Sequence, residues 1–157
     1  MQVVYQSSGV VDLWRPNSGL KKYVAAGLTS GVLDLTRLDW LFDSAKIKEQ
    51  RRYANGSVEM VLLDQPSEID RLTRPYLERC KELGISLPLA VMPVCADYEE
   101  YLEQYEIFLK SCMGLCAAYG ISSIMIPPLQ ADWTINRTFY DEIVTGAQDN
   151  KLQILLT

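Results

Sequence analysis

The sequence contains no histidine among its 157 residues. Histidine is the commonest acid–base group at neutral pH and the commonest metal ligand in proteins. A site built on an imidazole is therefore excluded for this chain. Acid–base chemistry would have to use other groups, carboxylates first among them, and the residues present point to no metal site and to no particular catalytic residue.

Long apolar runs are also missing. The sequence has no stretch of 18 or more apolar residues, and residues 1–6 lack the basic start and apolar centre of a signal peptide. Neither membrane insertion nor secretion is indicated, so we expect a cytoplasmic protein. The hydrophobic content of 48% and the absence of a low-complexity linker predict one globular domain over residues 1–157.

Basic residues are fewer than acidic ones. The sequence has 15 Lys and Arg and 20 Asp and Glu, which gives a net charge of −5. Nucleic-acid affinity depends mainly on cations that neutralise phosphates. We therefore expect no nucleic-acid partner. An endonuclease is set aside as well, because it would need a basic groove and several metal-binding histidines, and the sequence has no histidine and fewer basic than acidic residues.

The four cysteines show no Cys-x-x-Cys spacing, and we expect them to be reduced and buried. Cys95 follows an apolar run and precedes a helical segment, where a thiolate would be stabilised, but without histidine it has no obvious general base. Cys112 and Cys116 are four residues apart on a helical face of Tyr and Leu. We favour packing roles for all three over a nucleophile or a metal pair.

Apolar runs rich in branched residues recur at intervals of roughly thirty residues, the length of a βα unit. Such runs, bounded by Gly or Pro, are typical of buried parallel strands. The strong candidates are residues 87–94, 121–126 and 152–156, and the weaker ones are residues 3–5 and 32–35.

Segments of helical period separate these runs. The clearest covers residues 98–119, with Asp97 and Glu100 predicted as a capping box and Gly120 as its stop. Another carries Ile69, Leu72, Leu77, Cys80 and Leu83, ends at Gly84, and should kink or restart at Pro75. The others are residues 20–26, closed by Gly27, and a last helix with Phe139, Tyr140, Ile143, Val144 and Ala147.

Residues 36–64 interrupt the alternation. Residues 46–53 are charged, and Asn55-Gly56 separates them from the apolar residues 58–63. We interpret this stretch as an insertion with a short helix.

The alternation of strands and helices predicts an α/β fold with a parallel sheet and right-handed crossovers. A doubly wound sheet and a TIM barrel share this pattern, but no glycine-rich phosphate loop is present to favour the first. The sequence also stops on the run at residues 152–157. We therefore predict parallel β/α units of a partial TIM barrel, with about five strands of eight.

Short sequence motifs that resemble those of a known family occur in most of the chain outside residues 36–64. The motifs are Leu83-Gly84-Ile85, Met92-Pro93-Val94 and Tyr98-Glu99-Glu100-Tyr101, then Ala117-Ala118-Tyr119-Gly120 before Ile124-Met125-Ile126-Pro127-Pro128, then Asn136-Arg137-Thr138-Phe139-Tyr140 before Ile154-Leu155-Leu156, and Ala25-Ala26-Gly27-Leu28 before Gly31-Val32-Leu33-Asp34-Leu35. Together they resemble the N-terminal part of the xylose-isomerase-like TIM barrel family of sugar-phosphate isomerases and epimerases.

The resemblance implies a sugar or sugar-phosphate isomerase or epimerase, present here as a fragment. In that family a divalent metal polarises the substrate while a carboxylate moves a proton. The chain departs from the family at two positions: Thr157 lies at or next to the metal-binding Glu that closes the fifth strand, and Pro127 replaces the usual His. A divalent metal is thus implied only for a completed barrel.

Chemistry in a TIM barrel is located in the loops after the carboxyl ends of the strands. The residues at these positions are Ser7, Ser8, Asp34, Cys95, Gln130, Asp132, Trp133 and Thr157. We predict Asp34, Gln130, Asp132 and Trp133 as substrate-binding residues, with Trp133 stacking on a sugar face and Gln130 bonding hydroxyls. Two alternatives remain open, namely that Asp132 or Thr134 caps the next helix and that Asp34 serves a turn.

A function from another class also fits the sequence. A five-stranded piece would have unpaired edges near residues 3–5 and 152–156, and unpaired strands recruit other strands. The alternative is a non-catalytic partial-barrel module or remnant that self-associates, or that pairs with a complementary half.

Overall fold

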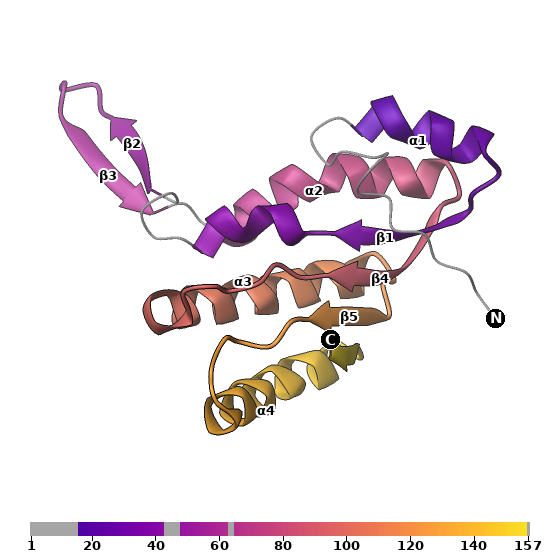
Figure 1. The fold of residues 1–157 in the computed structure, drawn as a ribbon. Helices are drawn as coiled ribbons and strands as arrows, with labels where there is room; N and C mark the ends of the chain where they lie inside the picture. The colour runs from indigo at the N-terminus through magenta and orange to yellow at the C-terminus, as the bar shows by residue number, and fades with distance from the viewer. Residues whose placement is uncertain (1–15, 43–47, 63–64, 157) are drawn as a thin grey trace.

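Strands and helices alternate along the chain in the computed structural model, which describes residues 16–42, 48–62 and 65–156. The predicted strand at residues 3–5 lies outside these ranges. The elements are α1 (Pro16–Ala25), β1 (Ser30–Asp34), the 3-10 helix η1 (Thr36–Phe42), β2 (Lys48–Arg52), β3 (Val58–Leu62), α2 (Gln65–Glu82), β4 (Ser86–Val91), α3 (Tyr98–Ala118), β5 (Ser123–Ile126), α4 (Trp133–Asp149) and β6 (Gln153–Leu156) (Figure 1).

Four strands form one parallel sheet in the order β1-β4-β5-β6. Each strand of this sheet lies beside the one that precedes it in the β/α alternation, and the strand order never reverses. A doubly wound sheet reverses its order at a switch point, whereas successive strands of a TIM barrel are neighbours. The predicted α/β class with parallel β/α units is confirmed.

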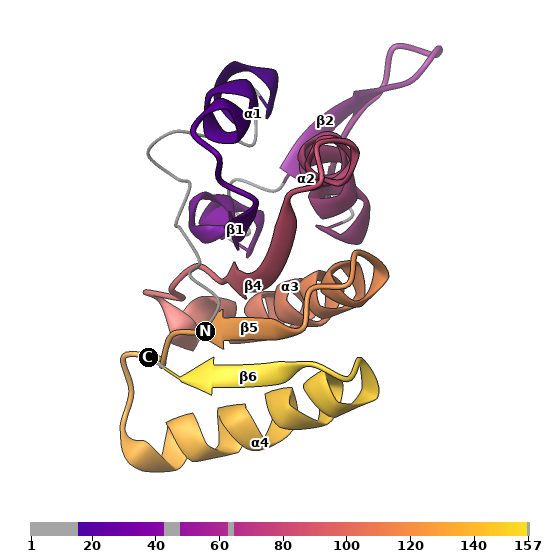
Figure 2. The same cartoon turned by 90° about the vertical axis from the view of Figure 1, so that its right-hand side faces the viewer.

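The helices between these strands follow one another along the sheet. Figure 2 shows α2, α3 and α4 in a row beside β4, β5 and β6, and α2 contacts α3, which contacts α4. Right-handed crossovers that always advance in the same direction place their helices on the same face of a sheet. The described sheet therefore has a helix-covered face and an opposite face. None of the described helices is both long and apolar enough to cross a membrane.

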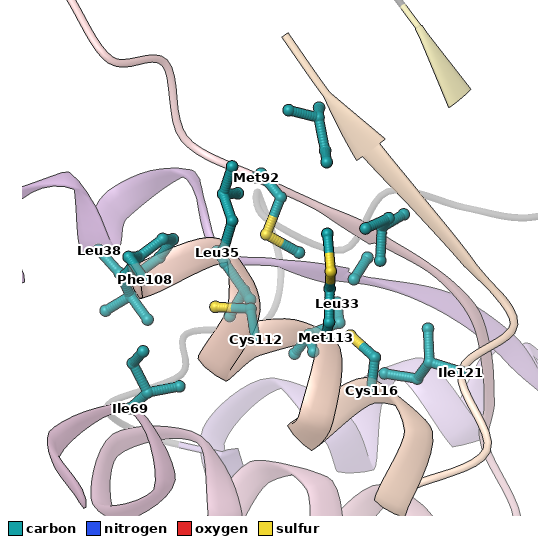
Figure 3. Close-up of a cluster of buried hydrophobic side chains, with 14 of the residues drawn as sticks. Leu33, Leu35, Leu38, Ile69, Met92, Phe108, Cys112, Met113, Cys116 and Ile121 are labelled. Atoms are coloured by element: carbon teal, nitrogen blue, oxygen red, sulfur yellow. The ribbon is translucent and has the colours of Figure 1, made fainter. Parts of the chain in front are cut away.

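The core lies between the sheet and its helices. Leu33, Ala90 and Ile124 are aligned across β1, β4 and β5 and are fully buried. Figure 3 shows Leu33 near α3, with Cys112, Met113 and Cys116 projecting into the same cluster from the helix. All four cysteines are buried free thiols, as expected. The apolar periodicity that predicted α3 therefore corresponds to its contact surface with the sheet.

The ends of α3 agree with the prediction at one terminus and differ at the other. Gly120 has a φ of +72°, and Ile121 N–H donates to Cys116 O at 2.9 Å, so the predicted glycine stop is confirmed. At the start, Asp97 occupies the N-cap position, but its side chain makes no capping hydrogen bond. Its φ of −115° and ψ of 63° depart from the extended backbone usual at an N-cap, so the predicted capping box was wrong.

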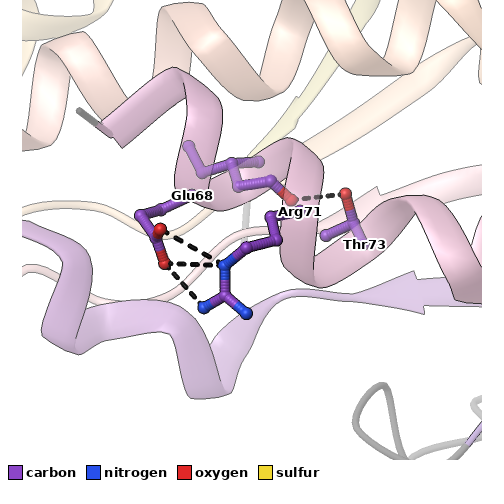
Figure 4. Close-up of polar contacts among 4 residues, drawn as sticks. Glu68, Arg71 and Thr73 are labelled. Carbon is purple, nitrogen blue, oxygen red and sulfur yellow. Dashed lines mark hydrogen bonds and ion pairs between the residues drawn. The ribbon is translucent and has the colours of Figure 1, made fainter. Parts of the chain in front are cut away.

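Helix α2 runs from Gln65 to Glu82 and contains Pro75, which is exposed. A proline inside a helix removes one backbone hydrogen bond. Side-chain contacts support the preceding turns: Arg71 donates to both carboxylate oxygens of Glu68, and Thr73 Oγ1 donates to Ile69 O at 2.6 Å (Figure 4). Helix α2 continues through Pro75, so the restart that was predicted there does not occur.

The insertion at residues 36–64 differs from the prediction of a short helix alone. Its first part is η1, but β2 and β3 then pair antiparallel as a hairpin that extends away from the sheet and helices (Figure 1). The turn contains Asn55 and Gly56, where Gly56 has a φ of +82° and Asn55 Oδ1 accepts from Ser57 N–H at 2.9 Å. Asn-Gly between strand-like segments is a strong hairpin signal. The hairpin therefore replaces the break that was predicted at Asn55-Gly56.

Candidate functional site

The carboxyl ends of the parallel strands meet at one edge of the sheet. Asp34 is the last residue of β1, residues 92–97 connect β4 to α3, and residues 127–132 connect β5 to α4. Of the predicted site residues, Gln130, Asp132 and Trp133 lie together at the β5–α4 connection. Asp34 lies at the same edge but two strands away, about 10 Å at ordinary strand spacing. Ser7, Ser8 and Thr157 lie outside the described residues.

Asp34 belongs to the face of the sheet opposite the helices. The register aligns Asp34 with Val91, Val91 with Met125 and Met125 with Leu155, and aligned residues of parallel strands share a face. The neighbouring row of Leu33, Ala90 and Ile124 faces the helices. Asp34 therefore ends a row of half-buried apolar side chains with a carboxylate, at the carboxyl edge of the sheet.

Asp34 also has a local role. Its Oδ1 accepts from Thr36 N–H at 3.0 Å and from Thr36 Oγ1 at 2.6 Å. These bonds start η1 directly after the strand. The turn role considered for Asp34 is confirmed, and its substrate-binding role stays a prediction.

Asp132 is the N-cap of α4. Its backbone is extended, with a φ of −66° and a ψ of 171°, and its Oδ1 accepts from Ile135 N–H at 2.9 Å. The capping alternative is therefore confirmed for Asp132. Asp132 is exposed at the carboxyl ends of the strands, so its capping role leaves the carboxylate accessible to a ligand. Its substrate-binding role stays a prediction.

Gln130 and Trp133 present the exposed side chains of the same connection. Gln130 is exposed, and Trp133, the first residue of α4, has 76% of its surface accessible. A tryptophan left so open offers a flat apolar face, while a glutamine amide both donates and accepts hydrogen bonds. Both side chains are therefore accessible to a ligand at the carboxyl edge of the sheet.

Asn136 holds the β5–α4 connection, a role that was not predicted from the sequence. It lies in the first turn of α4, is only 8% exposed, and forms hydrogen bonds to the backbone of the β5–α4 connection. A signal was present, because Asn136 shares the helical stripe of Phe139, Ile143 and Ala147, where an amide is out of place. In addition, Tyr140 OH donates to Ile126 O at 3.2 Å, at the end of β5.

The β4–α3 connection is held differently. Tyr105 OH, fully buried, donates to Pro93 O at 2.8 Å, and Met92 and Cys95 are each 1% exposed. Burial, and secondarily the charge of Asp97, raises the pKa of Cys95 to about 11. The thiol is therefore neutral at physiological pH, and the packing role preferred for Cys95 agrees with the structure.

The described residues do not fit the divalent metal that the resemblance implies. Within the described ranges, no group of three or more Cys, Asp or Glu side chains is placed to hold a metal ion. Cys112 and Cys116 are fully buried, and burial raises the pKa of both thiols, Cys116 to about 12. Core packing, preferred for these two residues over a metal pair, is what the structure has.

A groove of about 830 Å³ lies between α2 and α3. Its walls include Asp70, paired with Arg74 at 2.8 Å, and Tyr119, whose OH donates to Glu78 at 2.8 Å. The groove reaches Ser86 at the start of β4, so it follows the outer surface of the helices and approaches the amino ends of the strands. In TIM-barrel enzymes the active site lies at the opposite, carboxyl edge of the strands, so this groove is not where the resemblance predicts a site.

Comparison with known proteins adds no family to this description, since no protein-family model matches the chain and no curated protein does.

Proposed function

We propose that this chain supplies the sugar-binding part of an isomerase or epimerase with a β/α-barrel fold. The observation that carries the proposal is the β5–α4 connection, which presents Gln130, Asp132 and Trp133 together at the carboxyl edge of a parallel sheet. The reaction class comes from the motifs that resemble xylose-isomerase-like barrels.

The sheet supports a barrel architecture. Its strands are in sequential order, and the crossovers place their helices on one face. The opposite face carries the row from Asp34 to Leu155, in which Val91, Met125 and Leu155 are half-buried. Side chains of this kind fill the interior of a barrel in layers.

The polar groups at the carboxyl edge support a hydroxylated ligand. Trp133 offers a ring face, Gln130 offers an amide, and the Asp132 carboxylate is exposed beside them. Asp34 offers a second carboxylate from the face of the sheet opposite the helices, which we call the inner face. Because these carboxylates would repel a phosphate, we expect a neutral sugar to bind better than its phosphate ester.

The described residues are assigned to binding and orientation of the sugar. The metal that the resemblance implies would take its ligands from outside the described residues, because these hold no group of three or more Cys, Asp or Glu side chains placed to bind one. A carboxylate that moves a proton would have to reach the substrate carbon. Among the described residues, Asp34 offers a carboxylate at the end of the inner-face row.

The proposal is tested by NMR titration of the isotope-labelled protein with neutral aldoses and ketoses and with their phosphate esters. We expect a sugar to shift the Trp133 indole N–H and Gln130 amide signals, and Trp133→Ala to weaken that binding by about tenfold or more, as expected for the loss of a stacking platform. Val144→Ala is the matched control, because Val144 is an exposed apolar residue of the same helix.

If no sugar shifts these signals, the proposed function is wrong. If one does, the sugar is incubated with the protein in D₂O, with and without added Mg²⁺ or Mn²⁺. Exchange of a sugar C–H for deuterium, followed by ¹H NMR, would support the isomerase or epimerase class. A sugar that binds without any exchange would restrict the chain to binding.

The inner face of the sheet favours one second candidate, a partial-barrel module that pairs with itself or with a complementary half. On this face Val91, Met125 and Leu155 form a half-buried apolar row that reaches β6, the edge strand of the described sheet. Light scattering coupled to size exclusion over a concentration series tests it. A dimer that Leu155→Lys converts to monomer would support this module, and a monomer at every concentration would count against self-pairing.

A further inference from the structure

The Asn136 side chain forms four hydrogen bonds with the backbone of the β5–α4 connection. Its Oδ1 accepts from Leu129 N–H at 2.9 Å, and its Nδ2 donates to the carbonyl oxygens of Leu129 at 3.1 Å, Ala131 at 3.0 Å and Asp132 at 3.2 Å. Asn136 thus satisfies both backbone groups of Leu129, as a neighbouring strand would. Leu129 is itself 3% exposed, so its peptide groups need such partners.

These bonds define the path of the backbone on both sides of Gln130. Leu129 and Ala131, the neighbours of Gln130, are both bonded to Asn136, and Asp132 precedes Trp133. Asp132 independently caps α4 through Ile135 N–H. The side chains of Gln130 and Trp133 are exposed. The backbone that carries them is held in place by the buried side-chain amide of Asn136, which belongs to α4.

We propose that Asn136 is the positioning residue of this site, which orders the β5–α4 connection so that Gln130 and Trp133 are held in place before a sugar binds. The inference rests on the proposed function, since the ligand is the sugar proposed there. A loop that is ordered in advance does not lose conformational entropy when the ligand binds, so the same contacts give a higher affinity. Asn136 itself is buried and acts through its neighbours.

The experiment compares Asn136→Ala with Asn150→Ala in protein labelled with 5-fluorotryptophan. Asn150 is a matched control, because it is an asparagine at the other end of α4 whose Nδ2 donates to Gly146 O at 2.9 Å. The protein has three tryptophans, which we expect to give separate ¹⁹F signals. The signal that disappears in Trp133→Phe is assigned to Trp133. Affinity is measured with the neutral sugar that binds the unchanged protein best.

We expect Asn136→Ala to shift or broaden the Trp133 ¹⁹F signal in the absence of sugar and to weaken sugar affinity by about tenfold, the equivalent of one to two lost hydrogen bonds. The signal of Trp40, which lies in η1, should not change. Asn150→Ala should change neither the Trp133 signal nor the affinity. Asn136→Ser keeps a donor and an acceptor on a smaller side chain and serves as a milder second variant if Asn136→Ala does not fold.

The outcomes separate this inference from the proposed function. Sugar binding that is equal in the unchanged protein and the Asn136 variants overturns the positioning role and leaves the proposed function standing. Weaker binding with equal changes at Trp40 and Trp133 also overturns it, because the effect would then be a general loss of structure. If the unchanged protein binds no sugar, both proposals fail together.

Discussion

The β5–α4 and β4–α3 connections occupy equivalent places after neighbouring parallel strands. Each receives a hydrogen bond from a tyrosine hydroxyl, Tyr140 or Tyr105, at or near the end of its strand, but the two connections differ in what else holds them. The first is tied by the Asn136 amide and by the Asp132 cap. The second is anchored by burial of Met92 and Cys95, and its Asp97 side chain makes no capping bond. Polar anchoring fixes a backbone while leaving polar and aromatic side chains outside. Apolar anchoring uses the loop's own side chains for the core, so it leaves fewer for a ligand.

The largest expected effect tests the apolar anchor. Met92 is 1% exposed and reaches the core cluster of Figure 3. Met92→Ala should destabilise the protein by about 2–5 kcal/mol, because it removes buried methylenes and leaves a cavity. Urea unfolding followed by circular dichroism measures the change. Val94→Ala in the same connection is the control, since Val94 is 47% exposed and should cost about 0.5 kcal/mol or less.

The next effect concerns the hydroxyl groups that reach the strand ends. Tyr105→Phe should cost about 1–3 kcal/mol, because it leaves the buried Pro93 carbonyl without the Tyr105 donor. Tyr140→Phe should cost less, since the Tyr140 bond to Ile126 O is longer and only part-buried. Urea unfolding of both variants tests the order. Equal losses would show that burial does not distinguish the two connections.

A smaller effect is expected from the two helix caps. Asp132→Ala should destabilise the protein by about 1 kcal/mol, because it removes the bond to Ile135 N–H. Asp97→Ala should change the stability by about 0.5 kcal/mol or less, since no side-chain cap is lost. Paired thermal melts compare the two variants. If Asp97→Ala cost as much as Asp132→Ala, the contrast between the two helix starts would be wrong.

The smallest expected effect is that of pH on the free energy of unfolding. Below about pH 9, ionisation of Cys95 should not change this free energy. Burial raises the pKa of Cys95 from an ordinary value of about 9 to about 11. A raised pKa means that the native state favours the neutral thiol, so its contribution to stability is present in full below pH 9. That contribution is lost as the pH rises through about 11. Cys95 should therefore contribute no change in the free energy of unfolding as the pH rises to about 9, and urea unfolding should give a falling free energy above it.

The matched variant for this titration is Cys95→Val, which has no thiol at the same buried position. Its alkaline decline should be shallower but still present, because burial also raises the pKa of Cys80 to about 11. An unchanged decline in Cys95→Val would mean that Cys95 contributes nothing to the pH dependence.

Much of the fold could be predicted because its signals are local. Four of the five predicted strands correspond to β1, β4, β5 and β6, within a few residues at their ends, and the fifth, at residues 3–5, lies outside the described ranges. Gly120 was predicted as the stop of α3 because a positive φ costs glycine little. The hairpin in residues 36–64 was not predicted because its first strand, β2, has the sequence KEQRR and lacks the alternation of apolar and polar residues that indicates a strand.

For the candidate site, the sequence by itself determined which residues follow the strands, since that depends only on where apolar runs end. It could also offer Asp132 as a cap, because an N-cap bonds within its own first turn. Only the tertiary structure decided that Asn136 bonds Leu129, seven residues earlier, and that Tyr105 bonds Pro93, twelve residues earlier. Such bonds depend on the path that each connection takes between a strand and a helix, and that path is set by how the two pack together.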